Sequence, residues 1–162
     1  MPADIEFKVE GLDELIKRNA NLSRQYAPIV REFLDKTMYG FSAKAQHLAP
    51  VDTGLLRASL TKGKANNIWE IGGSPIPEWG MVGARLNYAP SVEYGSRPHY
   101  APIDRLQKWA KAHGLTAGQV WNAIWMRGTQ PHPFFKPAFD WSKGDLEKNL
   151  EEAVRQIEEA WQ

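Results

Sequence analysis

The longest regular pattern of apolar and polar residues lies near the start of the chain. Between positions 22 and 48 the apolar residues recur every three or four positions, which is the spacing of one face of an α-helix. They are Leu22, Tyr26, Ile29, Val30, Phe33, Leu34, Met38, Phe41, Ala45 and Leu48. Pro28 lies within this pattern, so we expect a break or a new helix start near residues 24–27. A stripe of this length needs a broad partner, which we expect to be a sheet.

Short segments with strand character lie on both sides of this helix. Apolar and charged residues alternate over positions 5–9, as in a half-buried strand. After Pro50, which should end the helix, we expect a short strand at 60–61 and better ones at 67–71 and 79–83. The Gly- and Pro-rich connection between the last two predicts a loop and an antiparallel pair.

The second half of the chain predicts mainly helices. Residues 89–94 support a short helical turn, and residues 102–127 predict a pair of helices in which Thr116 is the N-cap of the second. Apolar spacing from Leu146 to Trp161 predicts a C-terminal helix, with Ser142 or Asp145 as its cap. The Pro-rich segment before that helix is expected to be irregular.

These elements define a fold class. We predict an α+β protein in which a long N-terminal helix packs on a small antiparallel sheet, with an inserted helical pair and a C-terminal helix. The 162 residues, 43% of them hydrophobic, suit one domain over 1–162 with a helical insertion at about 102–127.

Composition excludes several classes of function. The chain has no cysteine, which excludes disulfide scaffolds, thiolate zinc sites and cysteine nucleophiles. We expect no signal peptide and no membrane partner, because the N-terminus lacks a cationic-then-apolar order and no apolar run is long enough to span a bilayer. A formal net charge of +1 is also low for a general nucleic-acid binder.

Charge is distributed unevenly along this nearly neutral chain. Residues 53–112 hold eight basic and four acidic side chains, whereas residues 145–162 hold six acidic and two basic ones. Two ordinary solvated faces explain this distribution on charge alone. The alternative is a pair of complementary patches through which copies of the chain associate head to tail.

Candidate catalytic groups are few. Asp52-Thr53-Gly54 is the tripeptide of aspartic peptidases, in which two such aspartates share a proton. Only one copy is present, so a peptidase would have to be a dimer, and a helix-ending turn explains the tripeptide without chemistry. Metal-site spacing is absent from the four histidines, which are His47, His99, His113 and His132. We therefore predict no enzyme, no catalytic or metal-binding residues and no cofactor.

Aromatic residues beside arginine allow a different function. Tyr94, Arg97 and Tyr100 stand close together and could stack on single-stranded bases. The spacings of Trp109, Trp121, Trp125, Phe134 and Phe135 fit burial better. A nucleic-acid or partner-binding role for the helical pair at 102–127 therefore remains the alternative.

Three segments in a fixed order carry a resemblance to a known family. They are HLAPVDTGLLRASL at 47–60, NYAPSVEYGS at 87–96 and PHPFFKPAFD at 131–140. Together they resemble the HK97 gp10-type family of tailed-phage neck and tail-completion (head–tail joining) proteins, over nearly the whole chain. The helical pair at about 102–127 departs from this pattern, because many shorter relatives run more directly from the second segment to the third.

The resemblance implies a structural virion protein made in the host bacterial cytoplasm. Such proteins are thought to form rings, commonly hexameric, at the head–tail junction or the head-proximal end of the tail. The implied partners are further copies of the chain, the connector and the tail-tube or tail-terminator proteins, with DNA only passing through the ring. A neighbouring connector or minor tail component is the alternative position.

Roles for individual residues follow from this resemblance. Asp52, Arg57, Glu93 and Arg97 could either brace the fold or contact another subunit, and Arg57 could pair with Asp52 or Glu93. Tyr88 and Tyr94 would anchor a loop that carries Glu93 to the surface, with a positive φ at Gly95. Phe134, Phe135 and Phe139 would hold the last crossing under the sheet. The acidic residues expected to contact the basic region of a neighbouring subunit are Glu151, Glu152, Glu158 and Glu159.

Overall fold

Three antiparallel strands form a small sheet in the order β1–β3–β2. The computed structural model of the chain describes residues 4–8 and 23–161. The strands are β1 (Asp4–Lys8), β2 (Asn67–Gly72) and β3 (Trp79–Ala84). In the register, Glu6 of β1 and Glu70 of β2 both lie opposite Met81 of the central strand. The strands expected near 5–9, 67–71 and 79–83 are therefore confirmed, except that Val9 lies outside the described residues.

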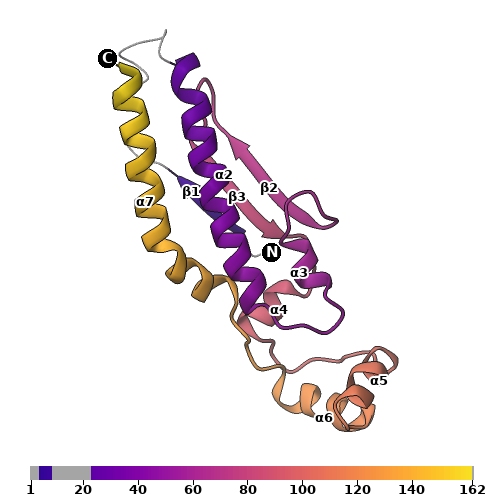
Figure 1. Cartoon of the computed structure of the whole chain (residues 1–162). Coiled ribbons are helices and arrows are strands. Elements are labelled where there is room, and N and C mark those ends of the chain that lie inside the picture. Colours follow the sequence, from indigo (N-terminus) through magenta and orange to yellow (C-terminus); the bar gives the residue numbers. More distant parts are fainter. Residues whose placement is uncertain (1–3, 9–22, 162) are drawn as a thin grey trace.

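Two long antiparallel helices lie side by side against this sheet (Figure 1). They are α2 (Ser23–Leu48) and α7 (Phe135–Trp161), which make the most extensive helix–helix contact in the described part of the chain. Helix α2 also packs on β2 and β3, as the sequence predicts. The break expected at 24–27 is absent: α2 begins at Ser23 and continues through Pro28, which as its sixth residue removes one hydrogen bond from the ladder without ending the helix.

The core lies between these helices and the sheet. Along α2 the buried apolar side chains are Tyr26, Val30, Phe33, Leu34, Met38, Phe41 and Ala45. Close approach of α2 to β3 depends on Gly80, where an added Cβ would lie 2.5 Å from the sulfur of Met38. The glycine in this strand is thus explained by helix packing.

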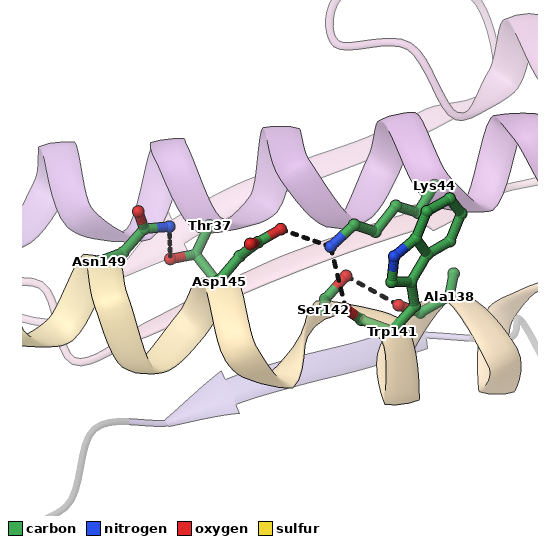
Figure 2. Close-up of polar contacts among 7 residues, drawn as sticks. All are labelled: Thr37, Lys44, Ala138, Trp141, Ser142, Asp145 and Asn149. Atoms are coloured by element: carbon green, nitrogen blue, oxygen red, sulfur yellow. Dashed lines mark hydrogen bonds and ion pairs between the residues drawn. The ribbon is translucent and has the colours of Figure 1, made fainter.

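Polar side chains hold α2 and α7 together along their exposed edge (Figure 2). Lys44 forms an ion pair with Asp145 and donates to the carbonyl of Trp141 at 3.1 Å. Asn149 donates to Thr37 Oγ1 at 3.3 Å, and Lys36 pairs with Glu152. Hydrogen bonds from Lys44 and Lys36, followed by the charges of these lysines, lower the pKa values of Asp145 and Glu152 respectively.

The segment after α2 differs from the sequence prediction. Residues 60–61, expected to be a short strand, form a turn that follows helix α3 (Leu55–Ser59). The helix buries Leu56, and Leu60 just beyond it is also buried. Its N-cap is Gly54 at φ 79°, without a side-chain cap bond, so neither Asp52 nor Thr53 caps the helix. The left-handed conformation that only glycine adopts readily makes the turn instead.

The remaining helices complete the fold. Helices α4 (Ala89–Tyr94), α5 (Ile103–Ala112) and α6 (Ala117–Arg127) match the predictions at 89–94 and 102–127. Thr116 is the N-cap of α6, in a reciprocal capping box with Gln119. Helix α7 begins earlier than expected, at Phe135, so Ser142 and Asp145 lie inside it and cap nothing. The predicted α+β class is confirmed.

Candidate assembly surfaces

The N-terminus of α7 is capped by a side chain from a distant segment. Glu93 of α4 is only 2% exposed. One carboxylate oxygen accepts hydrogen bonds from the amides of Phe134 at 2.7 Å and Phe135 at 2.9 Å, and the other accepts from the amide of Lys136 at 3.0 Å. The first amides of a helix lack partners within it, and its positive end favours an anion. Glu93 therefore braces the fold, and the expectation that it reaches the surface is wrong.

The three segments behind the family resemblance meet in one core cluster. This cluster contains Ala49 and Leu56 from the first segment, Ala89 from the second, and Phe134 and Phe135 from the third. The amide of His132 also donates to the carbonyl of Val92 at 2.7 Å, joining the second segment to the third. Residues that are far apart in the sequence thus build a single structural unit.

Asp52, in the turn between α2 and α3, and Arg57, in α3, are both exposed but differ in their contacts. Arg57 donates from Nε to the carbonyl of Ala49 at 3.1 Å, and within the described residues it forms no ion pair with Asp52 or Glu93. Asp52 is exposed. Burial, with a smaller contribution from the charge of Asp52, raises the pKa of Tyr88. Both side chains thus remain accessible to another molecule, and Arg57 in addition binds the end of α2.

Tyr88 and Tyr94 do not act as buried anchors. Tyr94 is 74% exposed and Tyr88 is 44% exposed, because the short helix between them turns Glu93 inward and leaves both rings outside. The predicted positive φ at Gly95 is confirmed, with a value of 73°.

A helical excursion leaves and re-enters the molecule at a single point. We call residues 97–128, which contain α5 and α6, the arm. Ser96 and Thr129 form an antiparallel bridge at its base, with N–O distances of 3.1 and 3.2 Å, and Thr129 Oγ1 donates to Ser96 Oγ at 2.9 Å. Gly128 permits this closeness, since an added Cβ would lie 1.9 Å from the carbonyl oxygen of Ser96. The arm projects from one end of the molecule (Figure 1).

Several large apolar side chains of the arm are exposed. Helix α6 has no buried residue, and Ala110 is the buried residue of α5. The two helices pack on each other and make little contact with the rest of the described chain. Trp121 and Trp125 stack at a centroid distance of 5.7 Å, yet Trp125 and Met126 remain 50% and 65% exposed. The predicted burial of Trp109 and Trp125 is wrong, and Trp121 is only partly buried. Phe134 and Phe135 are buried as predicted.

The arm is also basic. It carries five basic residues and one acidic residue, Asp104. The basic residues are Arg97, Arg105, Lys108, Lys111 and Arg127, all of them exposed. None of these cations forms an ion pair with any described residue. Arg97 stands at the base of the arm, so its placement is compatible with the predicted contact role.

The four predicted acidic contact residues of α7 are not equivalent. Glu152 pairs with Lys36 of α2, and Glu159 lies 4.0 Å from Arg155 in the same helix. Glu151 and Glu158 are exposed and have no ion-pair partner among residues 4–8 and 23–161. Glu152 therefore contributes to internal packing, while Glu151 and Glu158 remain accessible.

Three of the apolar residues whose spacing predicts the C-terminal helix are exposed in the structure, which the sequence did not indicate. Leu150, Val154 and Trp161 are 40%, 44% and 55% exposed. Their spacing places them on one side of the helix, together with the exposed Glu147, Glu151 and Glu158. We call these six residues the α7 stripe. The spacing of the three glutamates was visible in the sequence, but their exposure was not.

Other kinds of site find no support in the described residues. No cluster of three or more His, Asp or Glu side chains there could hold a metal ion. None of the helices described combines the length and apolar character needed to span a bilayer. Comparison of the chain with protein-family models, with curated proteins and with solved structures finds no match.

Proposed function

We propose that the chain is a structural protein of a tailed phage or prophage that assembles into a ring joining the head to the tail. The observation that carries this proposal is the convergence of the three segments that resemble head–tail joining proteins. Residues from all three pack in one cluster, and Glu93 of the second caps the helix that begins in the third. The resemblance thus coincides with a structural unit rather than with scattered similarities.

The surface of the protein suits assembly. The arm exposes apolar and basic side chains, and α7 exposes an acidic stripe. A closed ring requires a heterologous interface, in which two different patches of each subunit meet. In this function the ring surrounds passing DNA and its two faces contact the connector and the tail tube or tail terminator. No catalytic step is part of the proposal.

Removal of the gene from the phage or prophage that encodes the protein tests this function. An early stop codon should give DNA-filled heads and separate tails in electron micrographs, and a plasmid copy should restore joined, infectious particles. Joined particles of normal infectivity without the protein, in a strain shown by mass spectrometry to lack it, would contradict the proposal.

A nucleic-acid-binding function is the second candidate. Its support is the arm, which exposes Tyr100 and Trp125 together with basic residues that form no ion pair within the described part of the chain, and aromatic and basic side chains together bind single strands in other proteins. Fluorescence anisotropy with a labelled oligonucleotide distinguishes the two functions. Affinity that falls steeply as salt rises would favour this candidate, whereas no binding at low salt would exclude it.

A further inference from the structure

We propose that the arm of one copy binds the α7 stripe of the next copy. This inference rests on the proposed function, because it names the contact through which the ring would form. The arm is a two-helix unit with a single fully buried side chain in its helices, Ala110. Two helices that leave several large apolar side chains exposed are expected to bury them against another surface.

Charge indicates what covers the arm. Arg105, Lys108 and Lys111 recur every three residues along α5, and all are exposed without an ion-pair partner in the described chain. On the α7 stripe, Glu147, Glu151 and Glu158 are exposed and likewise have no ion-pair partner among the described residues. Opposite charges arranged in this way complement each other across an interface.

Apolar side chains accompany the charges on both surfaces. Trp125, Met126 and Ile103 of the arm are between 44% and 65% exposed. The α7 stripe offers Leu150, Val154 and Trp161 at comparable exposure. A central apolar contact with charged residues around it is the usual composition of a protein interface. Nucleic acid would complement the basic residues of the arm but would leave the stripe without a role.

The two surfaces cannot meet within one chain. The arm is attached near Phe134, at the start of α7, whereas the stripe begins at Glu147 and ends at Trp161. At 1.5 Å per residue, these positions lie about 18 to 39 Å further along the helix axis. Figure 1 shows the arm and the C-terminal end of α7 at opposite ends of the molecule. The contact is therefore intermolecular and heterologous, which generates a ring or an open chain of subunits.

Charge reversal on full-length protein tests this contact. The arm variant carries Arg105→Glu, Lys108→Glu and Lys111→Glu, and the stripe variant carries Glu147→Lys, Glu151→Lys and Glu158→Lys. Light scattering over a concentration series should show an oligomer for the wild type and monomers for each variant, with dissociation constants raised at least about 100-fold by facing like charges. The wild-type oligomer should also weaken as salt is raised.

Mixing the two variants gives the decisive result. One variant has both surfaces negative and the other has both positive. In the mixture, the reversed arm of one variant therefore faces the reversed stripe of the other, and the native arm faces the native stripe, so that opposite charges meet at both contacts. We expect the mixture to assemble with alternating subunits. The control variant Arg24→Glu, Arg31→Glu and Lys64→Glu changes the net charge of the protein as much as the arm variant does, but at exposed positions outside both surfaces. It should assemble like the wild type. Circular dichroism of every variant verifies that it is folded.

Several outcomes would overturn the contact. These are unchanged assembly of either variant, failure of the mixture to assemble, or a wild type that stays monomeric up to about 1 mM, the range of very weak complexes. Oligonucleotide binding that the arm variant loses while its self-association is unchanged would assign the arm to nucleic acid. The test of head–tail joining in the phage is independent of all these results, so the two proposals can fail separately.

Discussion

The body of the molecule and its arm contain the same kinds of apolar residue but bury them to different extents. By the body we mean α2, α7, the sheet, α3 and α4. In the body, Leu34, Met38 and Phe41 are almost completely buried. In the arm, Trp125, Met126 and Ile103 stay largely exposed although their helices are just as amphipathic in sequence. Apolar spacing thus predicted burial correctly in the body but not for these residues of the arm.

Charged residues show the same contrast. Body lysines Lys36, Lys44 and Lys62 each pair with a carboxylate of another element or segment. The arm's cations have no such partner among the described residues. These ion pairs join parts of the body to one another, whereas none of the ion pairs among the described residues joins the arm to the body.

Methionines in the two regions provide a matched pair of substitutions. Met38 is 0% exposed in α2, and Met126 is 65% exposed in α6. We expect Met38→Ala to lower the free energy of unfolding by about 2–5 kcal/mol, because it opens a cavity in the core. Met126→Ala should change it by less than about 0.5 kcal/mol. Urea unfolding of both variants measures the difference, and comparable losses would show that the arm belongs to the body's core.

The next largest effect is expected at the cap of α7. Glu93→Ala leaves three backbone amides without their acceptor. Because buried unsatisfied groups are costly, we expect this change to lower the free energy of unfolding by about 2–4 kcal/mol. Glu93→Gln keeps one oxygen acceptor but removes the charge that favours the helix N-terminus, so its loss should be smaller. Glu158→Ala on the exposed stripe serves as the control and should change the free energy of unfolding by less than about 0.5 kcal/mol. Equal stability of Glu93→Ala and the control would contradict the bracing role.

Local patterns predicted some features of this structure well and others not at all. Thr116 was predicted to be an N-cap from its position before a helical run, and its capping-box partner Gln119 lies only three positions further along the sequence. Glu93 caps a helix 41 residues away from it in the sequence, and no local pattern contains that pairing. Pro137 contributed to the prediction of an irregular segment, but it lies in the first turn of α7. A proline is tolerated there because an amide at that position has no hydrogen-bond partner within the helix. The same limit applies to the candidate surfaces. The sequence gives the charge and spacing of their residues, but it does not give their exposure.

Hydrogen exchange compares the two regions directly. Amides of a region that opens locally exchange faster than those of the core. In the monomeric charge-reversed variants, we expect the amides of α2 and α7 to exchange at least about 100-fold more slowly than those of α5 and α6. Assembly of the mixed variants should slow exchange in the arm and along the α7 stripe. Equal protection of arm and body in the monomer would show that the arm is stable without a partner.

The smallest predicted effect is a dependence of body stability on pH. Asp35 accepts hydrogen bonds from Lys62 at 2.8 and 2.9 Å and from Trp69 Nε1 at 2.9 Å. Burial alone would raise the pKa of Asp35, but these hydrogen bonds and the charges of Lys62 and Arg31 outweigh it and lower the pKa. The hydrogen bond to Asp35 is the main cause that raises the pKa of Lys62.

The directions of the two pKa shifts determine the pH range in which the pair of Asp35 and Lys62 stabilises the protein. A lowered carboxylate pKa gives stability that is present above the unfolded value of about 3.9 and is lost as pH falls through the folded value. A raised lysine pKa gives stability that is present below about 10.4 and is lost as pH rises through the folded value. Asp35→Asn should therefore cost at most about 1 kcal/mol near pH 7, since the pair is partly solvated. That cost should shrink at both pH extremes in urea titrations. A cost that does not vary with pH would show that the Asp35 cluster acts through shape and neutral hydrogen bonds rather than through charge.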